Sequence, residues 1–411
     1  MPRFTNITAS VDKAPEKDTT GRKNPVQNYP ALYPHYFYLQ WHITERCNWR
    51  CRHCYQLESE KENKELSLGN LLKIFRQYLR LIGYFNTLGP RRSRLSITGG
   101  EPLVRNDLFD FLKKISRYNK YFFLSIFTNG SLITREAAER LKALGVRQVQ
   151  VSLEGLQRNN DIIRGDGAFL KTIRAVKILV GLNVNVAVSV TLTRKNVSDI
   201  PELIRLCKRL GVRGLGLRRL VPIGRGVRLM EDMLNPLELR RVYAYIQREW
   251  EKTNRQGRGH SLFRLSRGCE EGIFSREVNQ PLNSCAVMDG RCLIVLHNGD
   301  VVPCRRLPIR LGNALEEDLI RIFYTSDRLR QLRNLNNASA LCLDCSCFES
   351  CLSGARCISH AYFDKISVPD PQCWKLFKKL PAPNLYDGTV EKSSPRQRVH
   401  PRLLPIDKNG R

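Results

Sequence analysis

The sequence lacks any long hydrophobic run. Its most apolar region, residues 175–192, is interrupted by Lys177, Asn183 and Asn185 and alternates as a β-strand does. No stretch has the pattern of a signal peptide or of a transmembrane helix. We therefore expect a cytoplasmic protein with no membrane span.

Acidic residues are scarce. The chain has 39 Asp and Glu against 68 Lys and Arg, which gives a net charge of +29. Such an excess favours an anionic partner, which could be nucleic acid, an acidic peptide or a phosphorylated or carboxylated substrate. It can also reflect lysines and arginines spread over a solvated surface. Because no RNA-binding motif accompanies the charge, an acidic peptide or small anion is favoured and nucleic acid is unlikely.

Cysteine is abundant, by contrast. Fourteen cysteines in a chain without a secretory signal favour metal binding over disulfide bonds. The 411 residues, 42% of them hydrophobic, are enough for a substantial core and about two to three domains.

The chain divides by composition and by hydrophobic period. Residues 1–33 are polar, and residues 379–411 are rich in proline and basic residues, so we expect a flexible basic arm and a flexible basic tail. Between them, strands are predicted at 37–43, 95–98, 122–127, 149–153, 184–190 and 214–220. Helices are predicted at 68–82, 108–115, 135–144, 168–180, 203–210 and 236–252. This alternation predicts an α/β fold with a parallel sheet, a partial (β/α)6 TIM-like barrel over residues 34–222. A bridging helical segment (223–283) and a small cysteine-rich domain (284–378) follow.

The first predicted strand is followed by three closely spaced cysteines, Cys47, Cys51 and Cys54, and then by Tyr55. Three thiolates bound to a four-iron cubane leave one iron open to a ligand, as in catalytic metal sites. A zinc knuckle or a disulfide is the alternative. The Cx3Cx2C spacing with a following aromatic resembles the radical S-adenosylmethionine (radical SAM) superfamily. The resemblance implies that the open iron of a 4Fe–4S cluster chelates SAM, whose reductive cleavage yields a 5'-deoxyadenosyl radical.

Further candidate residues follow the next strands, where parallel barrels place their active sites. Gly99, Gly100 and Glu101 begin a GGEP sequence, in which glycines permit close backbone approach and the acid can accept from an ammonium group. The resemblance implies that GGEP holds the SAM amino group and that Tyr55 contacts the adenine. It also implies that Asn129 contacts the ribose, although an ordinary Asn-Gly turn is an equal alternative. Ser152 and Arg164 match residues that hold the SAM carboxylate in this family, a role that suits the forked guanidinium.

A second set of eight cysteines resembles the SPASM domain, which carries two auxiliary 4Fe–4S clusters. The resemblance implies that Cys285, Cys292, Cys304 and Cys357 bind the first cluster, and that Cys342, Cys345, Cys351 and Cys373 bind the second. The pattern departs from the family at Ala355, where a cysteine is usual, and at Cys347, which is extra, so the ligand sets can exchange members. Zinc is an alternative for the cysteines between 342 and 351. Cys207 is expected in the core, and Cys269 has no assigned role.

The resemblance implies a SPASM maturase that abstracts a hydrogen atom from a ribosomally made peptide or protein and draws electrons from a low-potential donor such as a flavodoxin or ferredoxin. A haem-pathway enzyme that modifies carboxylates is the second hypothesis, and a non-catalytic, metal-binding nucleic-acid-binding protein is the third. Sulfatase-type maturases carry an aspartate where this chain has Arg305, which cannot accept a proton. This position therefore counts against formylglycine formation and predicts an acidic group nearby. An arginine cluster from Arg213 to Arg228 either steers an acidic ligand or pins a loop to the sheet.

Overall fold

The computed structural model describes residues 36–56, 65–87, 92–255, 264–266, 285–288 and 290–376. All of them belong to one compact unit, residues 33–411. The predicted arm, the predicted tail, much of the bridging segment and Cys269 lie outside the described residues. Within them, no helix has the length and apolar character needed to cross a membrane.

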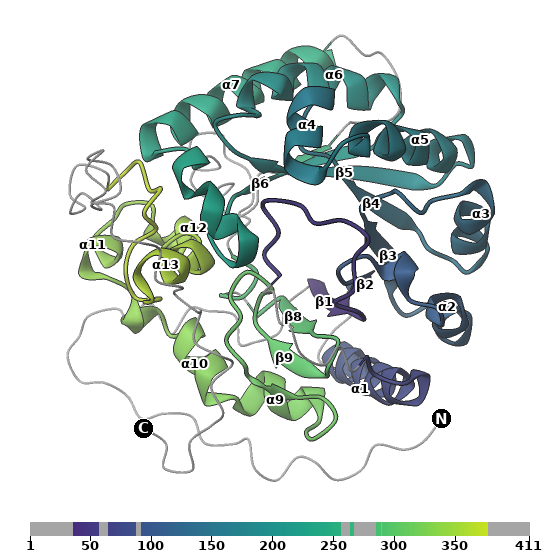
Figure 1. Cartoon of the computed structure of the whole chain (residues 1–411). Helices are drawn as coiled ribbons and strands as arrows, with labels where there is room; N and C mark the ends of the chain where they lie inside the picture. Colours follow the sequence, from purple (N-terminus) through teal and green to yellow (C-terminus); the bar gives the residue numbers. More distant parts are fainter. Residues whose placement is uncertain are drawn as a thin grey trace. The chain divides into compact units, whose positions relative to one another are not determined.

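The centre of the fold is a sheet whose six predicted strands are all present and parallel (Figure 1). These strands are β1 (Tyr36–His42), β2 (Arg92–Thr98), β3 (Phe123–Thr128), β4 (Gln148–Ser152), β5 (Asn185–Leu192) and β6 (Gly214–Arg219). They pair in chain order, as right-handed crossovers with intervening helices require. The prediction of a partial (β/α)6 barrel is therefore confirmed.

The helices cover the outer face of this curved sheet (Figure 1). The predicted ones are α1 (Leu68–Thr87), α2 (Leu108–Ser116), α3 (Arg135–Ala143), α5 (Ala168–Gly181), α6 (Ile200–Arg209) and α7 (Pro236–Arg255). On β1, Phe37, Leu39 and Trp41 are fully buried and point toward them, and the Trp41 ring meets Phe111 of α2 edge-on at 5.4 Å. Alternation along each strand thus sends the large apolar side chains outward into the main core.

The inner face of the sheet is polar instead. On β2 and β3, Ser96 and Ser125 share a hydrogen bond of 2.9 Å, and Arg94 Nε donates to Ser125 Oγ at 3.1 Å. Barrels of this kind usually fill their interior with branched apolar side chains. The interior of this barrel is therefore suited to a polar ligand.

The sheet continues beyond the six predicted strands. β7 (Arg264–Ser266) adds to β6, and β8 (Cys292–Val295) pairs in parallel with β1, so the sheet order is β10-β9-β8-β1-β2-β3-β4-β5-β6-β7. β9 (Asp300–Val302) and β10 (Gly312–Asn313) complete it antiparallel to their neighbours. The cysteine-rich segment therefore begins as an extension of the barrel sheet.

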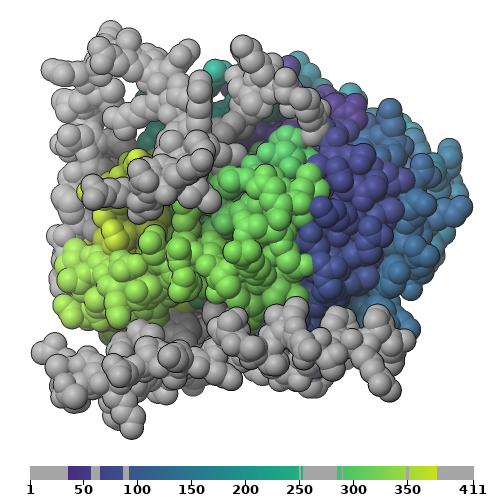
Figure 2. Space-filling view, turned by 90° about the horizontal axis from the view of Figure 1, so that it is seen from below, coloured from purple at the N-terminus to yellow at the C-terminus, as the bar shows by residue number. Residues whose placement is uncertain are grey.

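Short helices complete the C-terminal region: α9 (Leu319–Thr325), α10 (Asp327–Arg333), α11 (Ala340–Leu343), α12 (Phe348–Cys351) and α13 (Arg356–Phe363). Figure 2 shows the green segment that contains α9 directly beside α1. The Gln77 amide of α1 donates to the Ala314 carbonyl at 2.7 Å and accepts from the Leu319 amide at 3.0 Å. Both bonds are buried, so they fix the C-terminal region against the barrel.

Candidate functional site

The loop after β1 carries Cys47, Cys51 and Cys54 over the end of the barrel (Figure 1). Cys51 is buried and the other two are half-buried, and no disulfide joins the described cysteines. Burial raises the pKa of Cys47 to about 11, so without a bound cation this thiol stays protonated. Within the described residues, no three Cys, His, Asp or Glu side chains already sit as a ready metal site. Each cysteine of a cubane cluster binds a different iron, so a single-ion site is not required here, and ligation would remove the thiol protons.

Gly99 and Gly100 seat this loop. The Gly100 amide donates to the Thr44 carbonyl at 2.9 Å, and a Cβ added at Gly100 would stand 2.3 Å from the Arg46 carbonyl oxygen. At Gly99, an added Cβ would lie 2.5 Å from the Thr44 carbonyl oxygen. Only glycine permits this backbone approach, so the GGEP sequence has a structural function next to the three cysteines.

Glu101 lies beneath the same loop and is completely buried. Its carboxylate accepts from the Asn129 amide at 2.7 Å, from Thr128 Oγ1 at 2.8 Å and from the Leu103 amide at 3.2 Å. Burial raises its pKa to about 7, although these hydrogen bonds act in the opposite direction. Asn129 Nδ2 in turn lies 4.0 Å from Cys47 Sγ. The structure thus brings Cys47, Glu101 and Asn129 together.

Arg164 reaches the loop from the end of α4 (Gln157–Arg164), a helix that the sequence analysis did not predict. Its Nη1 lies 3.8 Å from Cys51 Sγ, its Nη2 forms a buried ion pair with Glu154, and its Nε has no partner among the described residues. Burial alone would raise the pKa of Glu154, but the charges of Arg164 and His53 lower it to about 2. Glu154 is therefore an ionised anchor for Arg164.

Sequence reasoning missed Glu154, although it directly follows a predicted strand in the segment Ser152-Leu-Glu. Ser152 itself ends β4 opposite Ser189 of β5, on the inner side of the sheet. Its side chain makes no hydrogen bond with another described residue, so its predicted role in SAM binding stays a prediction.

The acidic group predicted near Arg305 is Glu45, two residues before Cys47. Arg305 Nη2 donates to its carboxylate at 2.6 Å, and His297 Nδ1 lies 3.3 Å from the same oxygen. Burial opposes ionisation of Glu45, but His297 and Arg305 lower its pKa to about 2. The Arg305 guanidinium also lies over the Tyr55 ring, 5.7 Å from its centroid. The positive charge of Arg305 is therefore neutralised by Glu45 of the same chain.

The first predicted auxiliary set gathers around Tyr38, on the inner side of β1. Burial raises the pKa of Tyr38 well above its usual value, and nearby Cys292, Cys304 and Cys285 raise it further. Cys292 is the direct neighbour of Tyr38 across the β1–β8 pair. Cys304 also packs with Cys357 in a small apolar cluster, so this region holds all four predicted residues.

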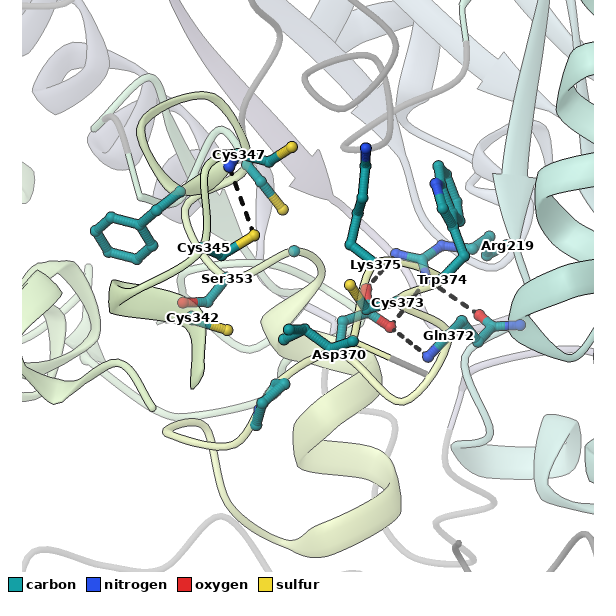
Figure 3. Close-up of a pocket in the computed structure, with 15 residues that line it drawn as sticks. Arg219, Cys342, Cys345, Cys347, Ser353, Asp370, Gln372, Cys373, Trp374 and Lys375 are labelled. Carbon is teal, nitrogen blue, oxygen red and sulfur yellow. Dashed lines mark hydrogen bonds and ion pairs between the residues drawn. The ribbon is translucent and has the colours of Figure 1, made fainter. Parts of the chain in front are cut away.

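The second predicted auxiliary set lines one cavity. The cysteines that line it are Cys342, Cys345, Cys347, Cys351 and Cys373. Figure 3 shows Cys342, Cys345 and Cys347 on one side of the cavity and Cys373 on the other. The extra cysteine, Cys347, therefore joins the predicted four as a fifth thiol.

Comparison with known proteins agrees with this geometry. The radical SAM superfamily profile matches residues 41–207, and the profile of an iron-sulfur cluster-binding domain, SPASM, matches residues 285–346. Mycofactocin maturase MftC of Mycobacterium tuberculosis (strain ATCC 25618 / H37Rv) is 31% identical over 348 residues, which cover 82% of each chain. The chain belongs to the radical SAM superfamily.

Two further similarities bear on this radical SAM enzyme. The AdoMet-dependent heme synthase of Nitratidesulfovibrio vulgaris (Hildenborough strain) is 26% identical over 82% of this chain and 91% of its own. The crystal structure of Streptococcus suis SuiB bound to precursor peptide SuiA superposes with a TM-score of 0.67, at 17% identity, over 82% of this chain and 76% of that chain. The second similarity establishes the shared fold.

Membership of the two families implies 4Fe–4S clusters and SAM as cofactors, and the residues present fit them. The chain offers three thiols in one loop and two further thiol groups, as cubane clusters require. Buried guanidinium nitrogens of Arg164 and Arg356 have no partner among the described residues, which suits neighbouring anionic groups. The donor set and the unpaired donors therefore both agree with bound clusters.

Two other sequence predictions concern single residues. Cys207 is 1% exposed on α6, as predicted for a core residue. In the arginine cluster, Arg219 forms a buried ion pair with Asp370, and Arg225 Nε donates to the Cys51 carbonyl at 3.0 Å. Arg219, the last residue of β6, therefore holds a C-terminal loop to the sheet as this interpretation predicts, whereas Arg225 lies outside the sheet and holds the cysteine loop.

Proposed function

We propose that this radical SAM enzyme is a SPASM maturase that abstracts a hydrogen atom from a ribosomally made peptide or protein. The observation that carries the proposal is the cysteine loop after β1, seated on Gly99 and Gly100 and supported by two further thiol groups. A bound cluster with an open iron supplies the electron that cleaves SAM to a 5'-deoxyadenosyl radical.

The residues of this chain bind and orient the cofactors. Cys47, Cys51 and Cys54 would hold the SAM-cleaving cluster. Asn129 and the Arg164 Nε would present hydrogen-bond donors to SAM, because both reach the cysteine loop. The backbone of Gly99, Gly100 and Tyr55 would contact the rest of the cofactor.

For Glu101, we propose a role other than direct binding of the SAM amino group. Three donors of its own chain already occupy its carboxylate, so we propose that it shapes the loop and, in its ionised form, would add negative potential near the SAM ammonium. A direct contact would require it to exchange one of these donors.

A peptide substrate is supported by four observations. The relative with 31% identity is named a mycofactocin maturase, and the SuiB structure of the same fold holds a precursor peptide. The polar inner face of the barrel would accept a polar segment, and the charge of +29 favours an acidic one. We propose a low-potential flavodoxin or ferredoxin as the electron donor.

The experiment compares cysteine variants of the anaerobically reconstituted enzyme. Cys47→Ala should abolish 5'-deoxyadenosine formation, whereas Cys304→Ala should retain some uncoupled SAM cleavage and lose modified product. Cys207→Ala is the matched control, because this core thiol belongs to no predicted cluster. Full SAM cleavage by Cys47→Ala would contradict the assignment of the radical site.

A tetrapyrrole substrate is the second candidate, because the heme synthase relative aligns over most of its length. Mass spectrometry of the enzyme with SAM and either a neighbouring precursor peptide or a carboxylated haem precursor separates the two. A mass change confined to the tetrapyrrole would replace the peptide proposal.

A further inference from the structure

Arg356 is the first residue of α13 and is one of the largest fully buried side chains in the molecule, at 1% exposure. Its Nη1 donates to the Ile366 carbonyl. Its Nε and Nη2 are buried without a partner among the described residues. A fully buried guanidinium is rare, and it normally has an acid beside it.

Asp370, which accepts from the Ala355 amide directly before Arg356, forms its ion pair with Arg219 instead. The two oxygens of Asp370 accept from Arg219 at 3.0 and 2.7 Å, and also from the backbone amides of Ala355 and Gln372 at 2.9 Å each. No ion pair joins Arg356 to any described carboxylate. An unpaired buried charge is strongly destabilising, so an anion is expected near this cation in the assembled enzyme.

Three cysteines of the predicted auxiliary sets lie near enough to act on the guanidinium, and a fourth, Cys357, is its neighbour in the chain. Burial lowers the pKa of Arg356, whereas the charges of Cys285, Cys342 and Cys351 raise it. Cys285 belongs to the first predicted auxiliary set, and Cys342 and Cys351 belong to the second. Cys357, the neighbour of Arg356 on α13, belongs to the first. Arg356 therefore lies within electrostatic reach of both sets.

We propose that Arg356 is a positioning residue that serves as a shared counter-charge for the two auxiliary clusters and raises the reduction potential of both. The proposal rests on the cysteine ligation proposed above. Four thiolates make a cubane cluster anionic, and uptake of one electron from a low-potential donor adds one negative charge. A nearby cation favours the more negative, reduced state, as do hydrogen bonds to cluster sulfurs.

The test is a redox titration of the holoenzyme, followed by electron paramagnetic resonance. Arg356→Gln removes the charge at similar size, and Arg356→Lys keeps it. Arg330→Gln, on the exposed face of α10, is the control for loss of one positive charge from the same region. Addition of SAM identifies the radical-site signal, because only that signal should respond.

With Arg356→Gln, both auxiliary potentials should become more negative while the potential of the radical-site cluster stays unchanged. Arg356→Lys should remain closer to the wild type, and Arg330→Gln should match it. Loss of auxiliary iron in the Gln variant but not in the Lys variant would also support a counter-charge. Equal iron loss in both variants would show a packing role and overturn the proposal.

Full iron content with unchanged potentials, or a shift in one auxiliary signal alone, would also overturn it. These outcomes differ from failure of the proposed function, in which the wild-type enzyme itself would lack auxiliary iron or would not cleave SAM.

Discussion

The ion pair between Arg219 and Asp370 offers a sharp test of how the barrel holds the second auxiliary site. Arg219 is the last residue of β6, and Asp370 lies in the wall of the five-thiol cavity (Figure 3). Two bonds of 3.0 and 2.7 Å join them, and their side chains are only 4% and 6% exposed. The perturbation is therefore Arg219→Met, Asp370→Asn and the double variant.

The magnitude follows from what each change leaves behind. Without Arg219, the Asp370 carboxylate keeps the two backbone donors but loses the cation with which it pairs among the described residues. Without the Asp370 charge, the buried guanidinium keeps Gln372 Oε1 at 3.1 Å as a neutral acceptor. Breaking a buried pair from one side costs about 3–5 kcal/mol, whereas replacing both partners by uncharged groups is often close to neutral. The double variant should therefore lose much less stability than the two single variants lose together.

The assay is denaturant unfolding of each variant, with iron content measured on the folded protein. Because several domains and clusters can break two-state behaviour, comparison of transition midpoints is safer than comparison of extrapolated free energies. Each single variant should unfold earlier and lose the iron of the second auxiliary site first, while the double variant recovers part of both. Single effects below about 1 kcal/mol, the range of exposed pairs, or strictly additive effects would refute the reasoning.

Three further predictions concern the cluster sites and their surroundings. Cys347→Ala should keep the wild-type iron content, because four other thiols line the same cavity; a loss of about four irons would make Cys347 a ligand. Glu154, whose folded pKa of about 2 lies below its usual 4.5, contributes stability above pH 4.5 that is lost as the pH falls toward 2. Melting curves of Glu154→Gln should therefore differ most from the wild type at neutral pH, and a constant difference down to pH 2 would contradict this. Reversal of the charge at the exposed Arg50 and Arg52 beside Cys51 should weaken the SAM cleavage that reduced flavodoxin supports, in a salt-dependent way. SAM cleavage supported by reduced methyl viologen should stay unchanged. An equal loss with both reductants would exclude a docking effect.

The six barrel strands could be predicted because their two faces differ so regularly. On β5, Val186, Val188 and Val190 are buried and alternate with half-exposed residues, which is a period that no helix of this length would show. The cysteine loop could be predicted because the spacing of metal ligands is local in sequence. Both signals are contained within about a dozen residues.

What could not be predicted depends on pairs that are distant in sequence. β8 has only four residues, and nothing in Cys292–Val295 indicates that its partner is β1, more than 250 residues earlier. The pair of Glu45 and Arg305 spans 260 residues. The sequence implied an acidic group near Arg305, but the identity of that acid depends on the fold.

The position of β1 explains why these distant contacts occur together. Its last residues lead into the cysteine loop, while Tyr38, near its start, lies beside three cysteines of the first auxiliary set. The strand from Tyr38 to His42 spans about 13 Å at 3.3 Å per residue. One strand, hydrogen-bonded on both sides by β2 and β8, therefore connects the cysteine loop to the region of the first predicted auxiliary set.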